Sequence, residues 1–145
     1  MNNNSINFKV HRTKEGTIFE VTSAVLIALA IALSFVVMNR NPDVGRGMVI
    51  QSFIMAGSTA LSLILAYAPH TFNIPDDSPA EAFVATIRLV RLASVLMASL
   101  SLGITLTALF GLQPVALLIG YGVILVGMIG WYMYRMHIIK RQTKK

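Results

Sequence analysis

Apolar residues run along this chain in four long stretches that contain no charged residue and no histidine. A bilayer core about 30 Å thick needs roughly 20 mostly apolar helical residues, at about 1.5 Å rise per residue, to cross it. Each stretch has about this length, so the pattern predicts an all-α membrane protein with four transmembrane helices. The stretches cover residues 21–38, 48–68, 92–110 and 115–134.

The connections between the stretches predict how the helices follow one another. Residues 39–47 join the first two stretches and residues 111–114 join the last two, so each pair is predicted to form an antiparallel hairpin. A polar insert from Pro69 to about Glu81 separates the two hairpins. The predicted layout is a cytoplasmic tail (1–16), a four-helix domain (17–135) with spans near 18–38, 48–68, 88–110 and 115–134 and a cytoplasmic loop (69–78), and a basic tail (136–145).

The composition supports a membrane protein and argues against a soluble one. Of the 145 residues, 55% are hydrophobic and 12% are charged, and the mean hydropathy is +0.69. A soluble domain carries about 25% charged residues, so this chain has too little polar surface to cover a water-facing globule. The absence of cysteine excludes disulfide frameworks, thiolate metal sites and cysteine nucleophiles.

The first apolar stretch has two interpretations, a cleaved signal peptide or a retained helix. Basic residues precede it, and Ala28-Leu29-Ala30 resembles a cleavage site, but apolar residues continue to Met38. Thr17 and Glu20 have the spacing of a capping box, in which the hydroxyl and the carboxylate satisfy free amides at a helix start. We therefore expect a retained helix that begins near Thr17.

The basic residues predict the orientation, because Lys and Arg near the ends of spans are retained on the cytoplasmic side. With the N-terminus inside, ten of the twelve Lys and Arg residues are cytoplasmic, and only Arg40 and Arg46 are outside. An aromatic anchor typical of a membrane interface lies just before Arg135 and consists of Trp131, Tyr132 and Tyr134. We therefore expect both termini in the cytoplasm.

The third helix is predicted to begin before its apolar stretch. Ser78 as N-cap, Pro79 at the first helical position and Glu81 at the third are separate helix-start signals. A helix from Pro79 to Phe110 would be about 48 Å long, which exceeds the hydrocarbon core. Its N-terminal turns, which carry Arg88 and Arg91 on a shared face, are therefore expected at the cytoplasmic interface.

Small and hydroxyl residues within the spans predict where helices pack, because close backbone approach drives helix association in lipid. Their second interpretation is a polar translocation path. Gln51 lies one turn from the predicted outer interface and is expected to reach water. The predicted packing residues are Ala56, Gly57, Ser58, Thr59, Ala60 and Ser62 in the second span, Ser94, Ala98, Ser101 and Thr105 in the third, and Gly120, Gly122, Gly127 and Gly130 in the fourth.

One part of the chain resembles a known bacterial family. A Pro-His-Thr-Phe-Asn-Ile-Pro run follows the second span, and Arg-Leu-Val-Arg leads into the third. Over about residues 48–110, these motifs resemble the uncharacterised membrane domain that also forms the N-terminal part of SdpI-type immunity proteins. Ile74 replaces a tyrosine of the family pattern, and the first external loop lacks the histidine that relatives carry. The matching residues are Pro69, His70, Phe72, Asn73, Pro75, Arg88 and Arg91.

The histidine of this motif has two interpretations. Pro69 cannot continue a helix, so the run favours a turn in which His70 packs at the interface. Alternatively, His70 is a ligand or a pH-sensitive switch that acts with Asp76 and Asp77. One imidazole and two flexible carboxylates are a poor metal site, so we predict neither a metal nor a cofactor.

The two arginines also have two interpretations. Arg88 and Arg91 are anchors that contact lipid phosphates, or they bind the carboxylates of Asp76, Asp77 or Glu81 and hold the loop against the helix.

No catalytic constellation occurs in the sequence, and we predict that the protein is not an enzyme. The resemblance implies an SdpI-like immunity or envelope-sensing role in the bacterial cytoplasmic (inner) membrane. The alternatives are a small four-helix transporter, for which Glu20 is the sole membrane carboxylate, and a non-catalytic assembly or scaffold subunit. The expected partners are the lipid bilayer and a membrane protein or peptide, and a second copy of the chain is a further candidate. Nucleic acid is not an expected partner.

Overall fold

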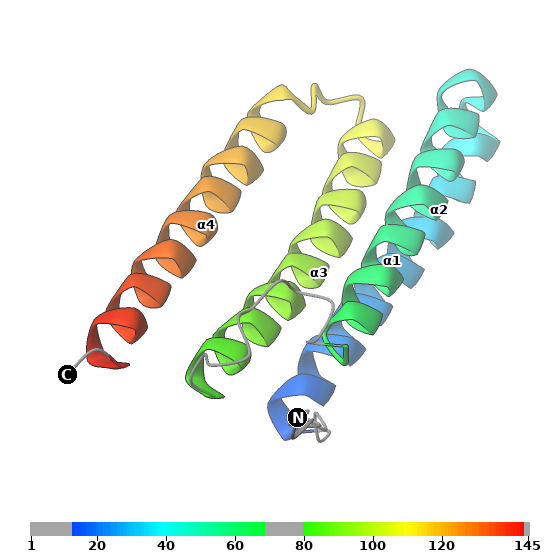
Figure 1. The fold of residues 1–145 in the computed structure, drawn as a ribbon. Helices are drawn as coiled ribbons and strands as arrows, with labels where there is room; N and C mark the ends of the chain where they lie inside the picture. Colours follow the sequence, from blue (N-terminus) through cyan, green and yellow to red (C-terminus); the bar gives the residue numbers. More distant parts are fainter. Residues whose placement is uncertain (1–12, 69–79, 144–145) are drawn as a thin grey trace.

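A computed structural model describes residues 13–68 and 80–143 of the chain. Over these residues the chain forms four long helices and no strand. The helices alternate in direction, so α1 begins and α4 ends at the same end of the molecule (Figure 1). The prediction of an all-α protein built from two antiparallel hairpins is confirmed. The helices are α1 (Lys14–Arg40), α2 (Pro42–Leu65), α3 (Ala80–Leu109) and α4 (Val115–Thr143).

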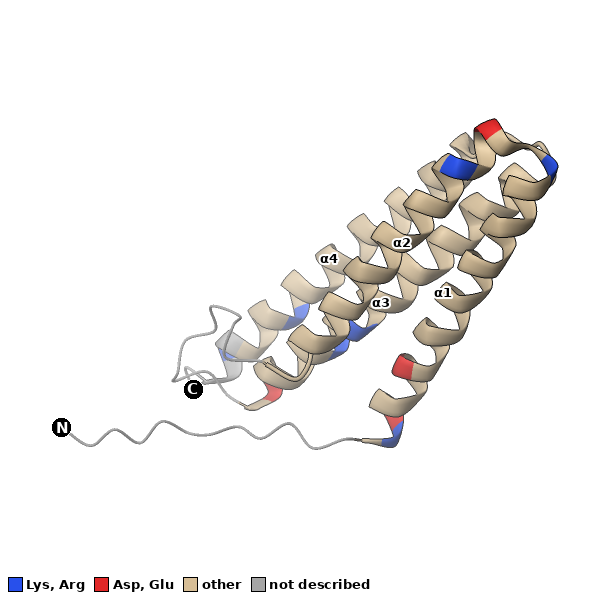
Figure 2. Cartoon of the chain, turned by 90° about the vertical axis from the view of Figure 1, so that its right-hand side faces the viewer, with Lys and Arg blue, Asp and Glu red and all other residues tan. Residues whose placement is uncertain are grey.

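All four helices are long and apolar enough to cross a membrane. The charged residues gather toward the two ends of the helices and leave the middle of each one uncharged (Figure 2). Many large apolar side chains are exposed on the outside of the helices. Such a surface is favourable in contact with lipid and unfavourable in contact with water. The chain is therefore an integral membrane protein that crosses the bilayer more than once.

The connection between α1 and α2 is much tighter than the predicted loop over 39–47. Only Asn41 separates the two helices, and its side chain accepts a hydrogen bond from the Val44 amide at 3.5 Å. Pro42 occupies the first turn of α2, where its missing N–H costs nothing. Gly45 then packs so closely on Met38 that a Cβ at position 45 would overlap the Met38 backbone. A glycine is therefore required for this turn.

The start of α1 also differs from the prediction. The helix begins at Lys14, and its N-cap is Thr13, whose hydroxyl accepts a hydrogen bond from the Gly16 amide at 3.1 Å. The predicted cap residue Thr17 lies one turn inside the helix and donates its hydroxyl to the Thr13 carbonyl at 3.2 Å. The predicted Thr17–Glu20 capping box is therefore wrong, because Thr13 is the N-cap and the Glu20 carboxylate accepts a hydrogen bond from Tyr67 instead.

The helices pack unequally around α3. This helix lies between α4 and the α1–α2 pair (Figure 1), and α1, α2 and α3 all pack against one another. The substantial contact of α4 is with α3 alone. The molecule is thus a three-helix unit with a fourth helix attached to one side.

The predicted packing face of α3 is confirmed, whereas the predictions for α2 and α4 are largely wrong. All four small residues of the α3 face are buried, but of the six predicted in α2 only Thr59 is. A Cβ added at any of the four glycines of the fourth span would meet nothing within 4 Å. The buried residues of the α3 face are Ser94, Ala98, Ser101 and Thr105.

Candidate functional site

Arg91 is the most unusual residue of the structure, because it is a buried charge in a membrane helix. Its side chain is 5% exposed. The guanidinium lies against the first turn of α1, where a Cβ at Gly16 would come within 2.5 Å of the Arg91 Cζ. Nε and Nη2 are both buried and have no hydrogen-bond partner among the described residues. A buried charge with nitrogens that lack a hydrogen-bond partner is costly, so Arg91 is the first candidate for a functional residue.

Tyr67 closes the junction from the end of α2. Its ring centroid lies 5.4 Å from the Arg91 Cζ, a cation–π distance. Its hydroxyl donates a hydrogen bond to the Glu20 carboxylate of α1. Since Gly16 and Glu20 are four residues apart, they share one face of α1. The three helices therefore bring Gly16, Glu20, Tyr67 and Arg91 together in one polar junction, which we call the Arg91 junction.

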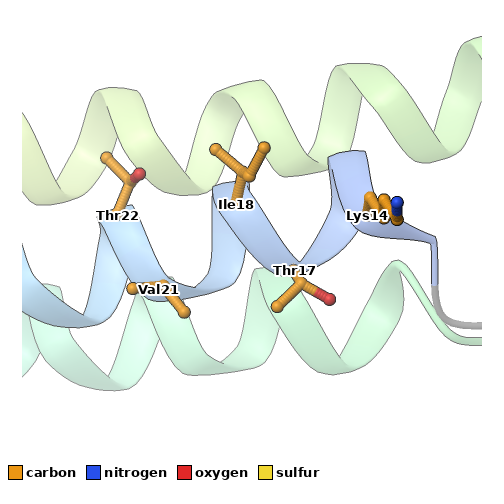
Figure 3. Close-up of a pocket in the computed structure, with 5 residues that line it drawn as sticks. All are labelled: Lys14, Thr17, Ile18, Val21 and Thr22. Carbon is orange, nitrogen blue, oxygen red and sulfur yellow. The ribbon is translucent and has the colours of Figure 1, made fainter.

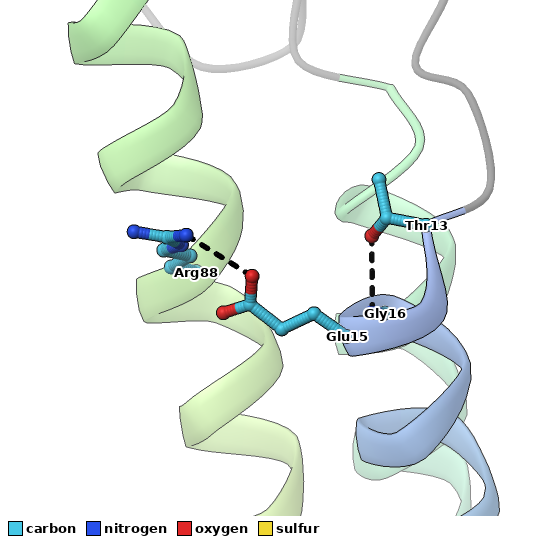
Figure 4. A network of polar contacts seen from close by, with 4 residues as sticks. All are labelled: Thr13, Glu15, Gly16 and Arg88. Atoms are coloured by element: carbon cyan, nitrogen blue, oxygen red, sulfur yellow. Dashed lines mark hydrogen bonds and ion pairs between the residues drawn. The ribbon is translucent and has the colours of Figure 1, made fainter.

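An ion pair lies beside this junction on its exposed side. The Arg88 guanidinium binds the Glu15 carboxylate at 3.0 Å, and both side chains are half exposed (Figure 4). The pair joins the first turn of α1 to α3. Exposed pairs of this type contribute about 0–1 kcal/mol, so this contact adds little to the stability of the unit.

The spacing of Arg88 and Arg91 predicted that they share one face of the helix and one environment. The structure shows two different environments. Arg88 is exposed and Arg91 is buried, because α1 covers only the second of them. Arg91 therefore does not lie on the outer surface of the helices but in a junction between them. The observed carboxylate partner of Arg88 is Glu15, and no bond from Arg88 to Glu81 occurs between these described residues.

Hydroxyl groups extend the polar character along the interior of the three-helix unit. Ser23 of α1 and Ser94 of α3 share a hydrogen bond at 3.1 Å. Thr105 donates to the carbonyl of Ser101 at 2.9 Å. Several other interior groups have no hydrogen-bond partner among the described residues, and Gln51 is one of them, although we expected it to reach water. These groups are Gln51 Oε1, Ser52 Oγ, Thr59 Oγ1 and Ser101 Oγ.

Two hollows lie away from the Arg91 junction. One, of about 420 Å³, follows the outer face of the first turns of α1 and is lined by Lys14, Thr17, Ile18, Val21 and Thr22 (Figure 3). The other, of about 450 Å³, lies at the opposite end of the molecule between the α1–α2 turn and the α3–α4 connection. The lining of the second hollow includes Asn41, Met48, Thr107 and Gln113. Neither hollow contains a carboxylate or a histidine among its described lining residues.

Several predicted site residues lie outside the described residues, so the interpretations of His70 stay predictions. Glu81 lies in the first turn of α3, but the predicted N-cap of that helix also falls in the part of the chain that is not described. Among residues 13–68 and 80–143, no group of three or more His, Asp or Glu side chains comes together. The predicted residues outside these ranges are Pro69, His70, Phe72, Asn73, Pro75, Asp76, Asp77 and Ser78.

Sequence reasoning did not identify Gly16 and Tyr67 as partners of Arg91. The four-residue spacing of Gly16 and Glu20 was a visible signal that they share a face. Nothing in the sequence paired that face with Arg91, 75 positions after Gly16, because this contact depends on how α1 packs against α3.

Comparisons of this chain with protein-family models, with curated proteins and with solved structures found no match.

Proposed function

We propose that this protein works by binding, in an SdpI-like immunity or envelope-sensing role in the bacterial inner membrane. The observation that carries the proposal is the Arg91 junction. Arg91, the second arginine of the Arg-x-x-Arg motif, is buried there between the helices. Two of its nitrogens have no partner among the described residues. Buried charges in membrane helices mark recognition sites and pathways. The resemblance to SdpI-type proteins supports immunity or sensing as the role of this binding.

The test is protection of cells against envelope-active peptides. Deletion of the gene is expected to increase sensitivity, and the wild-type gene in trans to restore resistance. Arg91→Gln is expected to fail in this rescue, whereas Arg135→Gln, which removes a charge from α4 near the same end of the molecule, is expected to succeed. Unchanged sensitivity after deletion would remove the proposal, and so would full rescue by a stably expressed Arg91→Gln variant.

The proposal includes an orientation with both termini in the cytoplasm. It is supported by the distribution of basic residues, of which only Arg40 and Arg46 are assigned to the outside. Alkaline phosphatase fused after Lys145 is expected to be inactive, and a fluorescent protein at the same position is expected to fluoresce. Active phosphatase at this position would reverse the orientation.

A second candidate function is a small transporter, and the interior hydroxyl groups favour it. Ser52, Thr59 and Ser101 place buried oxygens inside the three-helix unit without a hydrogen-bond partner among the described residues. Glu20, the sole carboxylate of the predicted transporter, lies at the inner end of this interior beside Tyr67. Under this candidate, Glu20→Gln abolishes drug efflux from cells that overproduce the protein. Efflux equal to that of the wild type would exclude Glu20-dependent transport.

A further inference from the structure

The unpaired atoms of Arg91 belong to one edge of its guanidinium. Nε and Nη2 are adjacent, and together they form an edge that can donate two parallel hydrogen bonds. Both atoms are buried and neither has a partner among the described residues. The edge therefore matches a ligand that presents two oxygens, such as a phosphate or a carboxylate group. A single hydroxyl or carbonyl would satisfy only half of it.

Apart from the Glu20 carboxylate, which accepts a hydrogen bond from Tyr67, the surroundings of this edge favour a negatively charged ligand. The guanidinium fits against position 16 because this residue is a glycine. A methyl group on Gly16 would overlap the guanidinium. The first turn of α1 lies beside it, and a helix N-terminus carries partial positive charge. Tyr67 stacks on the cation without neutralising it.

The position of the Arg91 junction along the helices favours a phosphate. Tyr132, within the aromatic anchor of α4, shares a hydrogen bond with Thr86 of α3 at 2.9 Å, so Thr86 marks the level of the membrane interface. Arg91 lies five residues, or about 7.5 Å, farther along α3. Its guanidinium reaches back to the level of Gly16, the third residue of α1. Basic pockets between transmembrane helices near the interface bind lipid headgroups, which carry phosphate.

The Arg88–Glu15 ion pair forms the rim of the Arg91 junction, and it is not a strong barrier to a ligand. Arg88 and Glu15 pair across the α1–α3 seam one turn away from Arg91, and both side chains are half exposed. An exposed ion pair contributes little free energy, so breaking this pair would cost little. We propose that the Nε–Nη2 edge of Arg91 binds a phosphate oxyanion, supplied by the headgroup of an anionic phospholipid or by free inorganic phosphate. This inference names the ligand class of the junction and therefore rests on the binding role proposed above.

The test uses the purified full-length protein in a phosphate-free maltoside detergent at constant ionic strength. Phosphatidylglycerol, inorganic phosphate, acetate and a galactolipid without phosphate are titrated separately, and the thermal unfolding midpoint is measured. Phosphatidylglycerol or inorganic phosphate is expected to raise the midpoint by about 5 °C. The one that does so identifies the source of the phosphate. No rise with either one, or an equal rise with acetate or galactolipid, would overturn the proposal.

Variants assign the effect to Arg91. Arg91→Gln is expected to lose the rise in midpoint, and Arg135→Gln, which removes one charge from α4, is expected to keep it. Equal loss in both variants would indicate general charge attraction and overturn the proposal. If Arg91→Gln does not fold, Gly16→Ala displaces the guanidinium without removing it. Native mass spectrometry should then measure at least about tenfold weaker binding of the phosphate ligand, and unchanged binding would contradict the proposal.

A matched glycine variant controls for general effects of Gly16→Ala. A Cβ at Gly57 would meet nothing within 4 Å, so Gly57→Ala is expected to bind phosphate as the wild type does. The two proposals fail separately. Protection against peptides without phosphate binding would remove this ligand and keep the role. Phosphate binding without protection would remove the role and keep a phosphate site.

Discussion

The three-helix unit of α1, α2 and α3 and the attached helix α4 differ in how much of their surface they bury. All four helices are nevertheless apolar enough to cross a membrane. Each helix of the unit buries small or hydroxyl-bearing residues, among them Ser23 in α1, Thr59 in α2 and Ser94 in α3. The apolar span of α4 buries none of its residues. Apolar character therefore places a helix in lipid, but it does not determine which helices pack together.

The difference has a physical cause. Lipid tails are as apolar as leucine, so transferring a leucine from lipid to a helix interface gains little. Small residues allow backbones to approach, and hydroxyl groups form hydrogen bonds across the interface. In the three-helix unit, the largest fully buried side chain is that of Thr105. α4 places its larger apolar residues outward, where they face lipid.

The largest expected effect contrasts two glycines. Gly45→Ala places a methyl group into the backbone of Met38 and is expected to lower the free energy of unfolding by about 3 kcal/mol or more. Gly122→Ala in α4 meets nothing within 4 Å and is expected to be neutral or to gain up to about 1 kcal/mol in helix propensity. Unfolding by SDS titration, followed by circular dichroism, measures both. Equal stabilities would break the distinction between the two regions.

A second contrast uses overpacking. Ala98 is fully buried in α3, so Ala98→Leu should force the helices apart at a cost of about 1–3 kcal/mol. Ala116 is exposed on α4, and Ala116→Leu should change stability by less than about 0.5 kcal/mol. The same SDS titration applies. A destabilising Ala116→Leu would indicate that α4 has a packing partner that the single chain lacks.

A third, smaller effect concerns the hydrogen bond between Ser23 and Ser94, whose oxygens lie 3.1 Å apart. A double-mutant cycle with Ser23→Ala and Ser94→Ala is expected to give a coupling energy of about 0.6 kcal/mol. Ser99 of α3, whose hydroxyl donates to the Leu96 carbonyl in the same helix at 3.0 Å, serves as the control partner. A cycle of Ser23 with Ser99 should show no coupling. Zero coupling in the first cycle would contradict this bond.

The smallest effect concerns the attachment of α4. Tyr132→Phe removes the hydroxyl that contacts Thr86 at 2.9 Å and is expected to cost about 0.5 kcal/mol. Tyr134, which is 64% exposed, supplies the control, and Tyr134→Phe should have no effect. Fluorescence of Trp131, the single tryptophan of the chain, reports on this interface during thermal unfolding. A larger effect at Tyr134 would place the interface on another face of α4.

Much of the fold was predictable because the hydrophobic pattern is strong. The four charge-free stretches identified four helices, and the spacing of Ser94, Ala98, Ser101 and Thr105 identified the buried face of α3. The tight α1–α2 turn was missed because the apolar run resumes only at Met48. The signals for an earlier helix start, an asparagine cap followed by Pro42 and an acidic residue, were present in the sequence.

The candidate site was much less predictable. The three-residue spacing of Arg88 and Arg91 implies a common face, but α1 covers Arg91 and leaves Arg88 exposed. Glu20 was interpreted as a cap, because a sequence does not reveal that Tyr67 will contact it. In the sequence, the glycines of α4 look like those of a helix-packing interface. Only the structure shows that no neighbouring atoms lie within 4 Å of a Cβ at these positions.

The sequence by itself determined the number of helices, their direction and their residence in lipid, because a bilayer of fixed thickness requires charge-free apolar runs of fixed length. Only the tertiary structure decided which of these helices form a packed unit and that Arg91 becomes a buried charge within it, with two nitrogens that have no partner among the described residues. The reason is that helix association in lipid depends on local fit between surfaces, and fit depends on atoms from helices far apart in the chain.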